Sequence, residues 1–291
     1  MSCTARQAVS RRAALTGGVA VALGAAAPAL GAADSFEALE KRLDGGRLGV
    51  FATNGTASLG HRADQRFPMC STFKALLAGQ ILARVDAGEE RLDRMVAYGP
   101  ADMVPHAPVT GAHLQAGALS VETLCQAIVE VSDNPAANLL LKTVGGPSGF
   151  TAWLRAIGDQ TTRLDRWETE LNEARPGDAR DTTTPRAMAE SLGRLFDGQV
   201  LGPASLGRLQ AWLQGSATGL ERLRKDLPAG WRAGDKTGTG DRGSANDVAV
   251  FWPPAGPRLY VACYITGTEV PMDVRNAAHA EVGRIARARL A

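Results

Sequence analysis

The chain has 291 residues, which is enough for one large domain or two small ones. Hydrophobic residues make up 45% and charged residues 21%, as in an ordinary globular protein. The formal net charge of +2 and the dispersed arginines give no argument for binding nucleic acid. After residue 34, no apolar run is long enough to span a membrane.

The first 33 residues differ from the rest of the chain. Two arginines at 11–12 precede an apolar, Ala/Gly-rich run, with three alanines at 25–27. A basic start, an apolar middle and small residues are typical of an export signal, and paired arginines indicate the twin-arginine route. We therefore expect an exported bacterial protein, periplasmic or secreted, that is cleaved between residues 27 and 34.

Hydrophobic spacing predicts the elements of the remaining chain in order. A short helix at 34–44 is followed by strands 48–53 and 56–61, which Asn54-Gly55 would join as a hairpin. Apolar residues at helical spacing then predict a series of helices at 71–87, 121–131, 135–144, 149–157, 185–196 and 203–213. The last elements are three strands and a closing helix, at 231–236, 247–252, 258–266 and 274–290.

Strands at both ends and helices between them predict an α+β fold with two lobes. Residues 34–66 and 215–291 would form an α/β lobe, an antiparallel sheet flanked by helices, into which an all-helical lobe at 67–214 is inserted. The irregular stretch at about 161–184 would be a functional loop, because structureless loops of this length are uncommon in compact domains. A cleft between lobes is a usual place for a small-molecule site.

The first candidate for chemistry is Ser71-Thr72-Phe73-Lys74, at the start of a predicted helix. Positions i and i+3 share a helix face, so the Ser71 hydroxyl and the Lys74 amine would lie side by side. A serine becomes a good nucleophile when a nearby base takes its proton, and a lysine with a lowered pKa can be that base. The alternative is an ordinary helix start with a serine cap and a surface lysine.

Two further motifs are weak when taken alone. Ser132-Asp133-Asn134 stands before a proline and predicts a tight polar turn, which could aim a hydroxyl and an amide into the cleft. Lys236-Thr237-Gly238 ends a predicted strand, where the lysine with the hydroxyls of Thr237 and Thr239 could bind a substrate carboxylate. The G-x-G-x-x-G run that starts at Gly238 leads into another strand and not into a helix, which argues against a dinucleotide site.

Glu168 lies in the long irregular stretch. It could act as a general base on a water molecule that Asn172 shares. Arg166 and Asp181 flank this segment and could close its neck as an ion pair. The alternative is a solvated, charged loop without a catalytic role.

The order of these motifs along the chain is more specific than any one of them. S-x-x-K, S-D-N and K-T-G together are a known signature of class A β-lactamases and penicillin-binding proteins. The sequence resembles a class A serine β-lactamase over essentially all of 34–291. The resemblance is densest in four segments, at 70–74, 132–140, 166–174 and 235–238.

The resemblance implies hydrolysis of the β-lactam amide bond of antibiotics through a serine acyl-enzyme, and hence β-lactam resistance. Ser71 would attack the carbonyl, Lys74 would take or relay its proton, and Ser132 would protonate the departing ring nitrogen. Glu168 and Asn172 would position the water that hydrolyses the ester. The acylation base would be either Lys74 or Glu168 acting through water.

The resemblance also implies how substrate is held. The backbone N–H groups of Ser71 and Thr239 would form an oxyanion hole. The substrate-binding residues would be those around the cleft, namely Asn134, Lys236, Thr237, Gly238, Thr239, Arg222 and His106. Arg222 would replace an arginine that several members carry where this chain has Ala245, with Arg275 as a second candidate. His106 stands where many members have an aromatic residue at the cleft mouth.

Other positions depart from the commonest family pattern. Thr169 takes the place of the usual proline after the catalytic glutamate, where the family has a cis peptide bond. Cys70 would face Gly240. Cys70, Cys125 and Cys263 remain after signal removal, an odd number that leaves at least one thiol without an internal partner. We expect Cys125 and Cys263 to be buried free thiols.

No metal or other cofactor is implied, since the four histidines show no zinc-ligand spacing. The expected partner is a small-molecule β-lactam, with no nucleic acid, no membrane in the mature form, and a monomeric state. The alternatives are a penicillin-binding D-Ala-D-Ala peptidase and a non-hydrolysing penicillin sensor. Both lack the deacylating glutamate, so the match at 168–172 argues against them.

Overall fold

A computed structural model of the protein describes residues 1–2 and 35–291. From residue 3 on, the predicted export signal lies outside the described residues. The residues from Ser35 to the end of the chain belong to one compact unit that mixes helices with an antiparallel sheet, which confirms the predicted α+β class.

The main sheet has five antiparallel strands in the order β2-β1-β9-β8-β7. Its strands are β1 (Arg47–Thr53), β2 (Ser58–His61), β7 (Arg232–Thr239), β8 (Ala245–Trp252) and β9 (Leu259–Thr266). The predicted pairing of the N-terminal and C-terminal segments is confirmed, because β1 lies beside β9 with Val50 opposite Cys263. The predicted hairpin at Asn54-Gly55 is also confirmed: Gly55 has a φ of 89°, and the Asn54 side chain accepts the Ala57 N–H at 2.8 Å.

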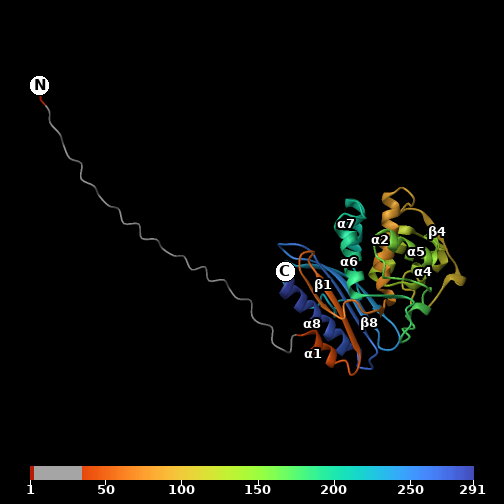
Figure 1. Cartoon of the computed structure of the whole chain (residues 1–291). Coiled ribbons are helices and arrows are strands. Elements are labelled where there is room, and N and C mark those ends of the chain that lie inside the picture. The colour runs from red at the N-terminus through yellow and green to blue at the C-terminus, as the bar shows by residue number, and fades with distance from the viewer. Residues whose placement is uncertain (3–34) are drawn as a thin grey trace. The chain divides into compact units, whose positions relative to one another are not determined.

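Helices cover both faces of this sheet (Figure 1). They are α1 (Phe36–Lys41), α2 (Phe73–Asp86), α3 (Val121–Glu130), α4 (Asn134–Thr143), α5 (Gly146–Ala156), α6 (Pro185–Phe196), α7 (Pro203–Gln214) and α8 (Met272–Leu290). Side chains of a strand alternate between its two faces, and each face of the sheet therefore has its own core. Val261 and Cys263 pack with α1 and α8, whereas Ala262 and Tyr264 pack with the other helices.

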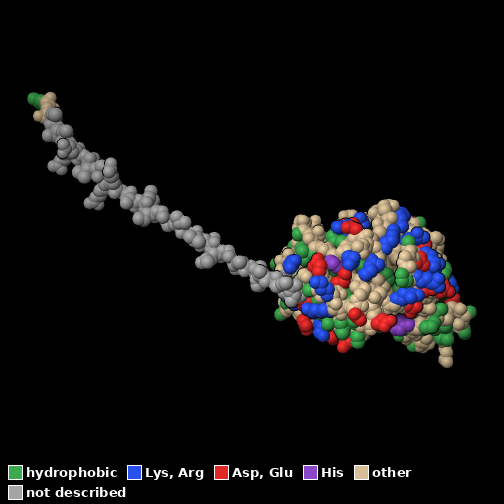
Figure 2. All heavy atoms as spheres, turned by 60° about the horizontal axis from the view of Figure 1, so that its bottom comes forward, with side chains coloured by type: hydrophobic (Ala, Val, Ile, Leu, Met, Phe, Trp, Pro, Cys, Tyr) green, Lys and Arg blue, Asp and Glu red, His purple; other side chains and the backbone are tan. Residues whose placement is uncertain are grey.

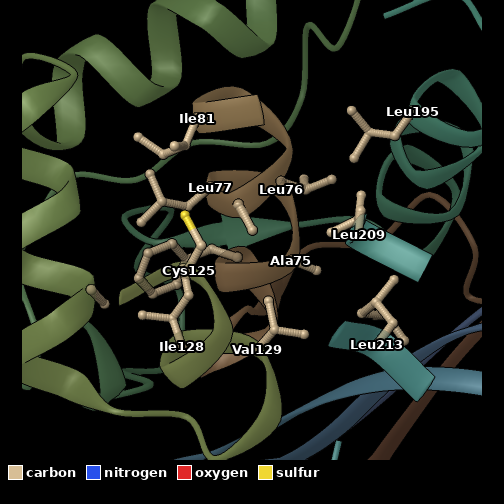
Figure 3. Packing of buried hydrophobic residues seen from close by; sticks show 14 of the residues in the cluster. Ala75, Leu76, Leu77, Ile81, Cys125, Ile128, Val129, Leu195, Leu209 and Leu213 are labelled. Atoms are coloured by element: carbon tan, nitrogen blue, oxygen red, sulfur yellow. The ribbon is translucent and has the colours of Figure 1, made fainter. Parts of the chain in front are cut away.

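Helix α2 is the centre of the larger core and carries the first motif at its start. Every residue from Phe73 to Leu82 is buried. Figure 3 shows apolar side chains of α3, α6 and α7 around α2, among them Cys125, Ile128, Leu195 and Leu209. A helix enclosed in this way has little freedom to move, so it fixes the positions of the polar residues at its N-terminal end.

Sequence periodicity missed the shortest elements. Two-residue and three-residue strands pair as β3 (Phe67–Pro68) with β6 (Thr182–Thr183), and as β4 (Met95–Ala97) with β5 (Ala118–Ser120). The described residues also contain the short 3₁₀ turns η2 (Cys70–Thr72), η3 (Pro100–Asp102), η4 (Leu114–Ala116) and η5 (Glu170–Asn172). Elements of this length are too short to show a hydrophobic period.

The predicted helix at 71–87 needs one correction at its start. The α-helix begins at Phe73, and Ser71 lies in the preceding turn η2. The left-handed backbone of Cys70, with a φ of 46°, prevents a helix from extending back beyond Ser71, and Cys70–Thr72 form the tighter 3₁₀ turn. The nucleophile candidate therefore sits on a tight turn that leads into a buried helix.

Helix α6 belongs by residue number to the predicted helical lobe, yet it packs against β1 and β9. The division into lobes at 66/67 and 214/215 stays a prediction. No helix among the described residues has the length and apolar character needed to cross a membrane. One face of the molecule shows acidic and basic side chains interspersed (Figure 2), in agreement with the small net charge.

Candidate active site

Ser71, Lys74 and Glu168 meet in one buried hydrogen-bonded cluster. The Lys74 Nζ lies 3.0 Å from the Ser71 Oγ and 2.9 Å from the Glu168 Oε1. The Ser71 Oγ in turn donates to the Glu168 Oε1 at 3.1 Å. The side chains of Lys74 and Glu168 are completely buried. The three groups predicted from the sequence therefore converge, although they come from positions almost a hundred residues apart.

The surroundings of Lys74 change its acidity. Its amine also donates to the Asn134 Oδ1 at 2.5 Å and to the Ser132 carbonyl at 2.9 Å. Burial lowers the pKa of Lys74, and the nearby carboxylate of Glu168 partly opposes this shift. A lowered pKa makes the neutral amine more available at neutral pH, which suits a proton acceptor for the Ser71 hydroxyl.

Ser132 stands between two amines. Its φ of 62° is a left-handed conformation that few residues other than glycine adopt. This backbone turns its carbonyl toward Lys74 and its hydroxyl toward Lys236, whose Nζ lies 3.1 Å from the Ser132 Oγ. The Lys74 Nζ is 3.4 Å from the same oxygen. Ser132 is therefore placed to pass a proton between groups in the cleft.

Asp133 locks this turn. Its carboxylate caps α4 by accepting the Ala136 N–H at 2.9 Å, and it accepts the N–H groups of Val109 and Thr110, each at 2.9 Å. The Thr110 hydroxyl donates to it at 2.8 Å. Asp133 is completely buried, and both of its carboxylate oxygens accept hydrogen bonds. These bonds hold the neighbouring Ser132 in its unusual backbone conformation.

Lys236 is completely buried in β7. It donates to the Thr237 carbonyl at 2.8 Å as well as to Ser132. Burial, followed by the charge of Lys74, lowers the pKa of Lys236 to about 7. Next to it, the Thr237 hydroxyl lies 2.7 Å from the hydroxyl of Thr218, a residue that the sequence analysis did not single out.

Strand β7 passes very close to the turn that carries Ser71, and Gly238 makes this approach possible. A Cβ at this position would lie 2.8 Å from the Met69 carbonyl oxygen and 3.1 Å from the Ser71 nitrogen. Any side chain would therefore push the strand away from the Ser71 N–H. Gly238 contributes through the space that it leaves for the two backbones.

Glu168 is held by two asparagines. The Asn172 Nδ2 donates to the Glu168 Oε2 at 2.7 Å. Asn138 on α4 makes two bonds to the backbone of Glu168: its Oδ1 accepts the N–H at 3.0 Å, and its Nδ2 donates to the carbonyl at 2.9 Å. The Glu168–Thr169 peptide bond is cis, as the resemblance implied.

Asn138 was missed as a site residue. The available signal was its place four residues after Asn134, on the same face of a predicted helix. The predicted ion pair at the neck of the loop is confirmed, with the Arg166 Nε 2.6 Å from the Asp181 Oδ2. Asp181 also accepts the N–H groups of Asp165 and Arg166, at 2.8 and 2.9 Å.

Arg222 lies beside the strand that ends the K-T-G motif. Its Nη2 donates to the Thr239 Oγ1 at 3.1 Å, and its Nη1 donates to the carbonyls of Gly238 and Asn246 at 3.2 and 2.6 Å. Ala245, which stands where several members carry an arginine, is paired with Thr239 across β7 and β8. Arg275, the other candidate, is near enough for its charge to oppose protonation of Arg222, whose pKa is lowered mainly by burial.

A cleft of about 340 Å³ connects these residues with solvent. The exposed side chain of His106 is at the cleft, and its Nε2 lies 2.9 Å from the Val131 carbonyl oxygen. Lys74, Glu168 and Lys236 are buried beneath the cleft surface. The lining combines predicted residues with Thr218: Ser71, His106, Ser132, Asn134, Asn172, Thr218, Arg222, Thr237, Gly238 and Thr239.

All three thiols in the described residues, Cys70, Cys125 and Cys263, are free and buried, which confirms the expectation for Cys125 and Cys263. The prediction that Cys70 faces Gly240 is confirmed too, since a Cβ at Gly240 would lie 2.7 Å from the Cys70 Sγ. Within residues 1–2 and 35–291, no three His, Cys, Asp or Glu side chains are arranged to hold a metal ion.

Comparisons with known proteins agree with this geometry. A family model described as "Beta-lactamase enzyme family" matches residues 32–290. The curated relative Beta-lactamase AST-1 of Nocardia asteroides is 48% identical over 243 residues, which are 83% of this chain and 78% of the relative.

Solved structures of class A enzymes are similar over nearly the same range. The last common ancestor of Gram-negative bacteria (GNCA4) β-lactamase class A is 55% identical, with a TM-score of 0.85, and the match covers 88% of this chain and 99% of that one. A putative class A β-lactamase, PenP from Rhodopseudomonas palustris, is 52% identical with a TM-score of 0.85, over 88% and 98% of the two chains. Neither the peptidase nor the sensor alternative is favoured by these matches. The chain belongs to the β-lactamase family as a class A serine enzyme, which hydrolyses β-lactams and confers resistance to them.

Proposed function

We propose that Ser71 is the nucleophile of this hydrolase and Lys74 the group that accepts or relays its proton. The Ser71 Oγ would attack the β-lactam carbonyl, the ring C–N bond would break, and an ester to Ser71 would form. The 3.0 Å contact between Lys74 and Ser71 supports direct proton transfer. The 3.1 Å hydrogen bond from Ser71 to Glu168 supports the other candidate for the acylation base, because it places the Glu168 carboxylate within direct reach of the same proton.

Ser132 would complete acylation by delivering a proton to the ring nitrogen. Its hydroxyl lies within 3.4 Å of the Lys74 Nζ, from which it would be reprotonated. Lys236, 3.1 Å away, would orient this hydroxyl and balance the negative charge that develops in the transition state. The proton that leaves Ser71 would thus reach the leaving nitrogen without entering bulk solvent.

Glu168 and Asn172 would then act on the ester. The carboxylate would take a proton from a water molecule that attacks the ester carbonyl, and it would return this proton to the Ser71 Oγ as the ester C–O bond breaks. Its 2.7 Å bond from Asn172 and the two backbone bonds from Asn138 keep the acid aimed at Ser71. A carboxylate held this rigidly needs little reorganisation at each turnover.

Substrate would lie in the cleft with its carboxylate toward Lys236, Thr237 and Thr239. Arg222 would support this end indirectly, by orienting the Thr239 hydroxyl. Asn134 would bind the acylamino side chain, with His106 at the mouth of the cleft. The backbone N–H groups of Ser71 and Thr239 would hold the oxyanion, and loss of one such donor typically costs about 2.7–4 kcal/mol of transition-state stabilisation.

The observation that carries these assignments is the 3.1 Å separation of the Ser71 Oγ and the Glu168 Oε1. The decisive variant is Glu168→Ala, with Glu170→Ala as a matched control because Glu170 lies in the same loop but is exposed. We expect Glu168→Ala to accumulate an acyl-enzyme, seen as a stable mass increase after mixing with benzylpenicillin. The control should return to its unmodified mass. A Glu168→Ala protein that also returns rapidly would remove Glu168 from deacylation.

We also propose that residues 1–33 direct twin-arginine export, and that the mature enzyme acts as a monomer in the periplasm or outside the cell, without membrane or nucleic-acid partners. The support is the sequence pattern at 11–33. Replacing both Arg11 and Arg12 by lysine should abolish the resistance that the full chain gives to a susceptible bacterium, while Arg6→Lys should not. Full resistance in the double variant would contradict this route.

A further inference from the structure

A second cavity lies behind the loop of residues 163–182, and the reaction steps above do not use it. Its volume is about 140 Å³. Six of its lining residues are arginines, and Asp178 is the one carboxylate among them. The arginines come from three parts of the fold: Arg47 and Arg66 near the start of the sheet, Arg166, Arg175 and Arg180 in the loop, and Arg242 in the turn between β7 and β8.

The three loop arginines are balanced by carboxylates of the same loop. The Arg166 Nη1 lies 2.7 Å from the Glu173 Oε2, and its Nε pairs with Asp181. Arg175 pairs with Glu173 as well. The Arg180 Nη2 is 2.6 Å from the Asp178 Oδ2. Three positive and three negative charges therefore cancel within the loop.

The other three arginines are a surplus. Within the described part of the chain, Arg47, Arg66 and Arg242 form no ion pair with a carboxylate. Arg47 donates to the Gln65 Oε1 at 3.2 Å and stacks on a phenyl ring 4.4 Å away. Arg66 donates to the Thr182 Oγ1 and the Thr161 carbonyl, each at 3.0 Å.

Arg242 is the freest of the three. Its exposed side chain makes no hydrogen bond with any other described residue, although its backbone carbonyl accepts the Gly267 N–H at 2.8 Å. A guanidinium offers five N–H donors and cannot lose its charge at ordinary pH. Arg242 thus offers the cavity N–H donors that no described residue uses, while Arg47 and Arg66 use only part of theirs within the protein.

We propose that this cavity binds a compact oxyanion with two negative charges, of which inorganic phosphate is the simplest. Guanidinium groups match such ions because their planar N–H pairs can donate to two oxygens at once. A volume of about 140 Å³ has room for an ion of about five non-hydrogen atoms but not for a β-lactam. The excess of arginines over carboxylates favours a negatively charged ligand, and the volume of the cavity favours a small one.

The bound ion would brace the catalytic loop from behind. Leu171 lines the cavity, and the next residue, Asn172, donates to the Glu168 carboxylate. Asp241, the neighbour of Arg242, donates its N–H to the Asn172 carbonyl at 3.0 Å. An ion held between Arg242 and the loop arginines would therefore join the turn after β7 to the loop. Because it binds only the folded loop, it would raise the melting temperature.

The test is thermal unfolding of the mature enzyme in millimolar phosphate and in chloride at equal ionic strength, without β-lactam. We expect phosphate to raise Tm by about 3–6 °C at ten times its Kd, and chloride to have little effect. Arg242→Gln combined with Arg47→Gln should abolish this rise. Arg232→Gln is a charge-matched control, since Arg232 is exposed and lies outside the cavity lining. All variants should still hydrolyse nitrocefin in chloride buffer.

Three outcomes would overturn the proposal. Equal phosphate stabilisation of the wild type and the double variant would indicate general salting-out. Competition between phosphate and nitrocefin that persists in the double variant would place the ion at the substrate-carboxylate site. No stabilisation of the wild type by phosphate would show that the cavity binds no such ion. As a second measurement, phosphate should slow tryptic cleavage after Arg180 in the wild type only.

Discussion

The front and the back of the loop at 163–182 are held by opposite means. At the front, toward Ser71, the charges of Glu168, Lys74 and Lys236 are completely buried and linked by short hydrogen bonds. At the back, pairs such as Arg180 with Asp178 are partly exposed, and positive charge is in excess around a cavity. The same loop thus contacts a buried network of hydrogen-bonded charges on one side and a set of solvent-exposed ion pairs with excess positive charge on the other.

This difference indicates which side carries the chemistry. A buried charge without a partner is very unfavourable, so a desolvated cluster keeps one arrangement, and that is what proton transfer requires. Exposed ion pairs are weak, screened by salt and easily rearranged. Substitutions at the front should therefore change turnover, whereas those at the back should change only how firmly the loop is held.

The largest effect should come from Lys74→Ala. It removes the amine that contacts Ser71 and leaves the Glu168 carboxylate without its cation. Loss of a positioned base or acid typically lowers rates about 10²–10⁴-fold, and we expect kcat/KM for benzylpenicillin to fall within that range. The matched change at the back, Arg180→Gln, should leave kcat/KM nearly unchanged. Equal losses in the two variants would abolish the distinction between front and back.

Asn138→Ala should give the next largest effect. It deletes two hydrogen bonds to the backbone of Glu168, each worth about 0.5–1.5 kcal/mol, so the free energy of unfolding should fall by about 1–3 kcal/mol. Deacylation should slow more than acylation, because only the acid's position changes. Asn138→Asp keeps the acceptor and loses the donor. Its deacylation rate, measured by stopped flow, should therefore lie between those of the wild type and Asn138→Ala. If both rates are unaffected, Asn138 supports the loop without positioning Glu168.

A smaller effect at the front of the loop should come from pH, through the charge of Lys236. The pKa of Lys236 is lowered to about 7, so its charge is present below that pH and is lost as pH rises. In the unfolded chain this lysine stays protonated up to about pH 10.5. The contribution of Lys236 to the free energy of unfolding should therefore rise between pH 7 and 10.5, because the folded protein no longer buries a charge there.

Substrate binding, in contrast to stability, should weaken as pH rises above 7. Loss of the Lys236 charge weakens attraction for the β-lactam carboxylate, and kcat/KM should fall up to about tenfold per pH unit above 7. Lys236→Arg keeps its charge throughout and should flatten this fall, whatever its overall rate. A wild-type profile that stays level from pH 7 to 9 would show that Lys236 remains charged in the free enzyme.

The sequence predicted the long elements and the chemistry-bearing residues because both leave repeated local signals. Apolar spacing located α6 at its observed ends, Pro185–Phe196, and the turn residues Asn54-Gly55 located the first hairpin. Ser71 and Lys74 are only three positions apart, so their contact follows from local geometry. The family resemblance then supplied distant partners such as Glu168.

What the sequence did not predict depends on contacts between distant segments. Asn138 reaches Glu168 across 30 positions, and the Thr218 hydroxyl meets Thr237 across 19. The spacing of four residues from Asn134 places Asn138 on the same helix face but does not point to Glu168, and Thr218 has no local pattern that distinguishes it from an ordinary loop residue. The arginines around the second cavity are similarly dispersed, and only folding brings Arg47 and Arg242 to one place.

The contact between Gly240 and Cys70 restricts how this enzyme can change under antibiotic selection. A side chain at 240 would meet the Cys70 Sγ at 2.7 Å and the Asn172 carbonyl oxygen at 2.8 Å. The sulfur can be removed by a single mutation, whereas the carbonyl belongs to the main chain of the loop. A smaller residue at 70 would therefore relieve only the first of these contacts. Any replacement of Gly240 would still have to move the loop that carries Glu168, so variation at 240 should be costly for deacylation even after Cys70 is replaced.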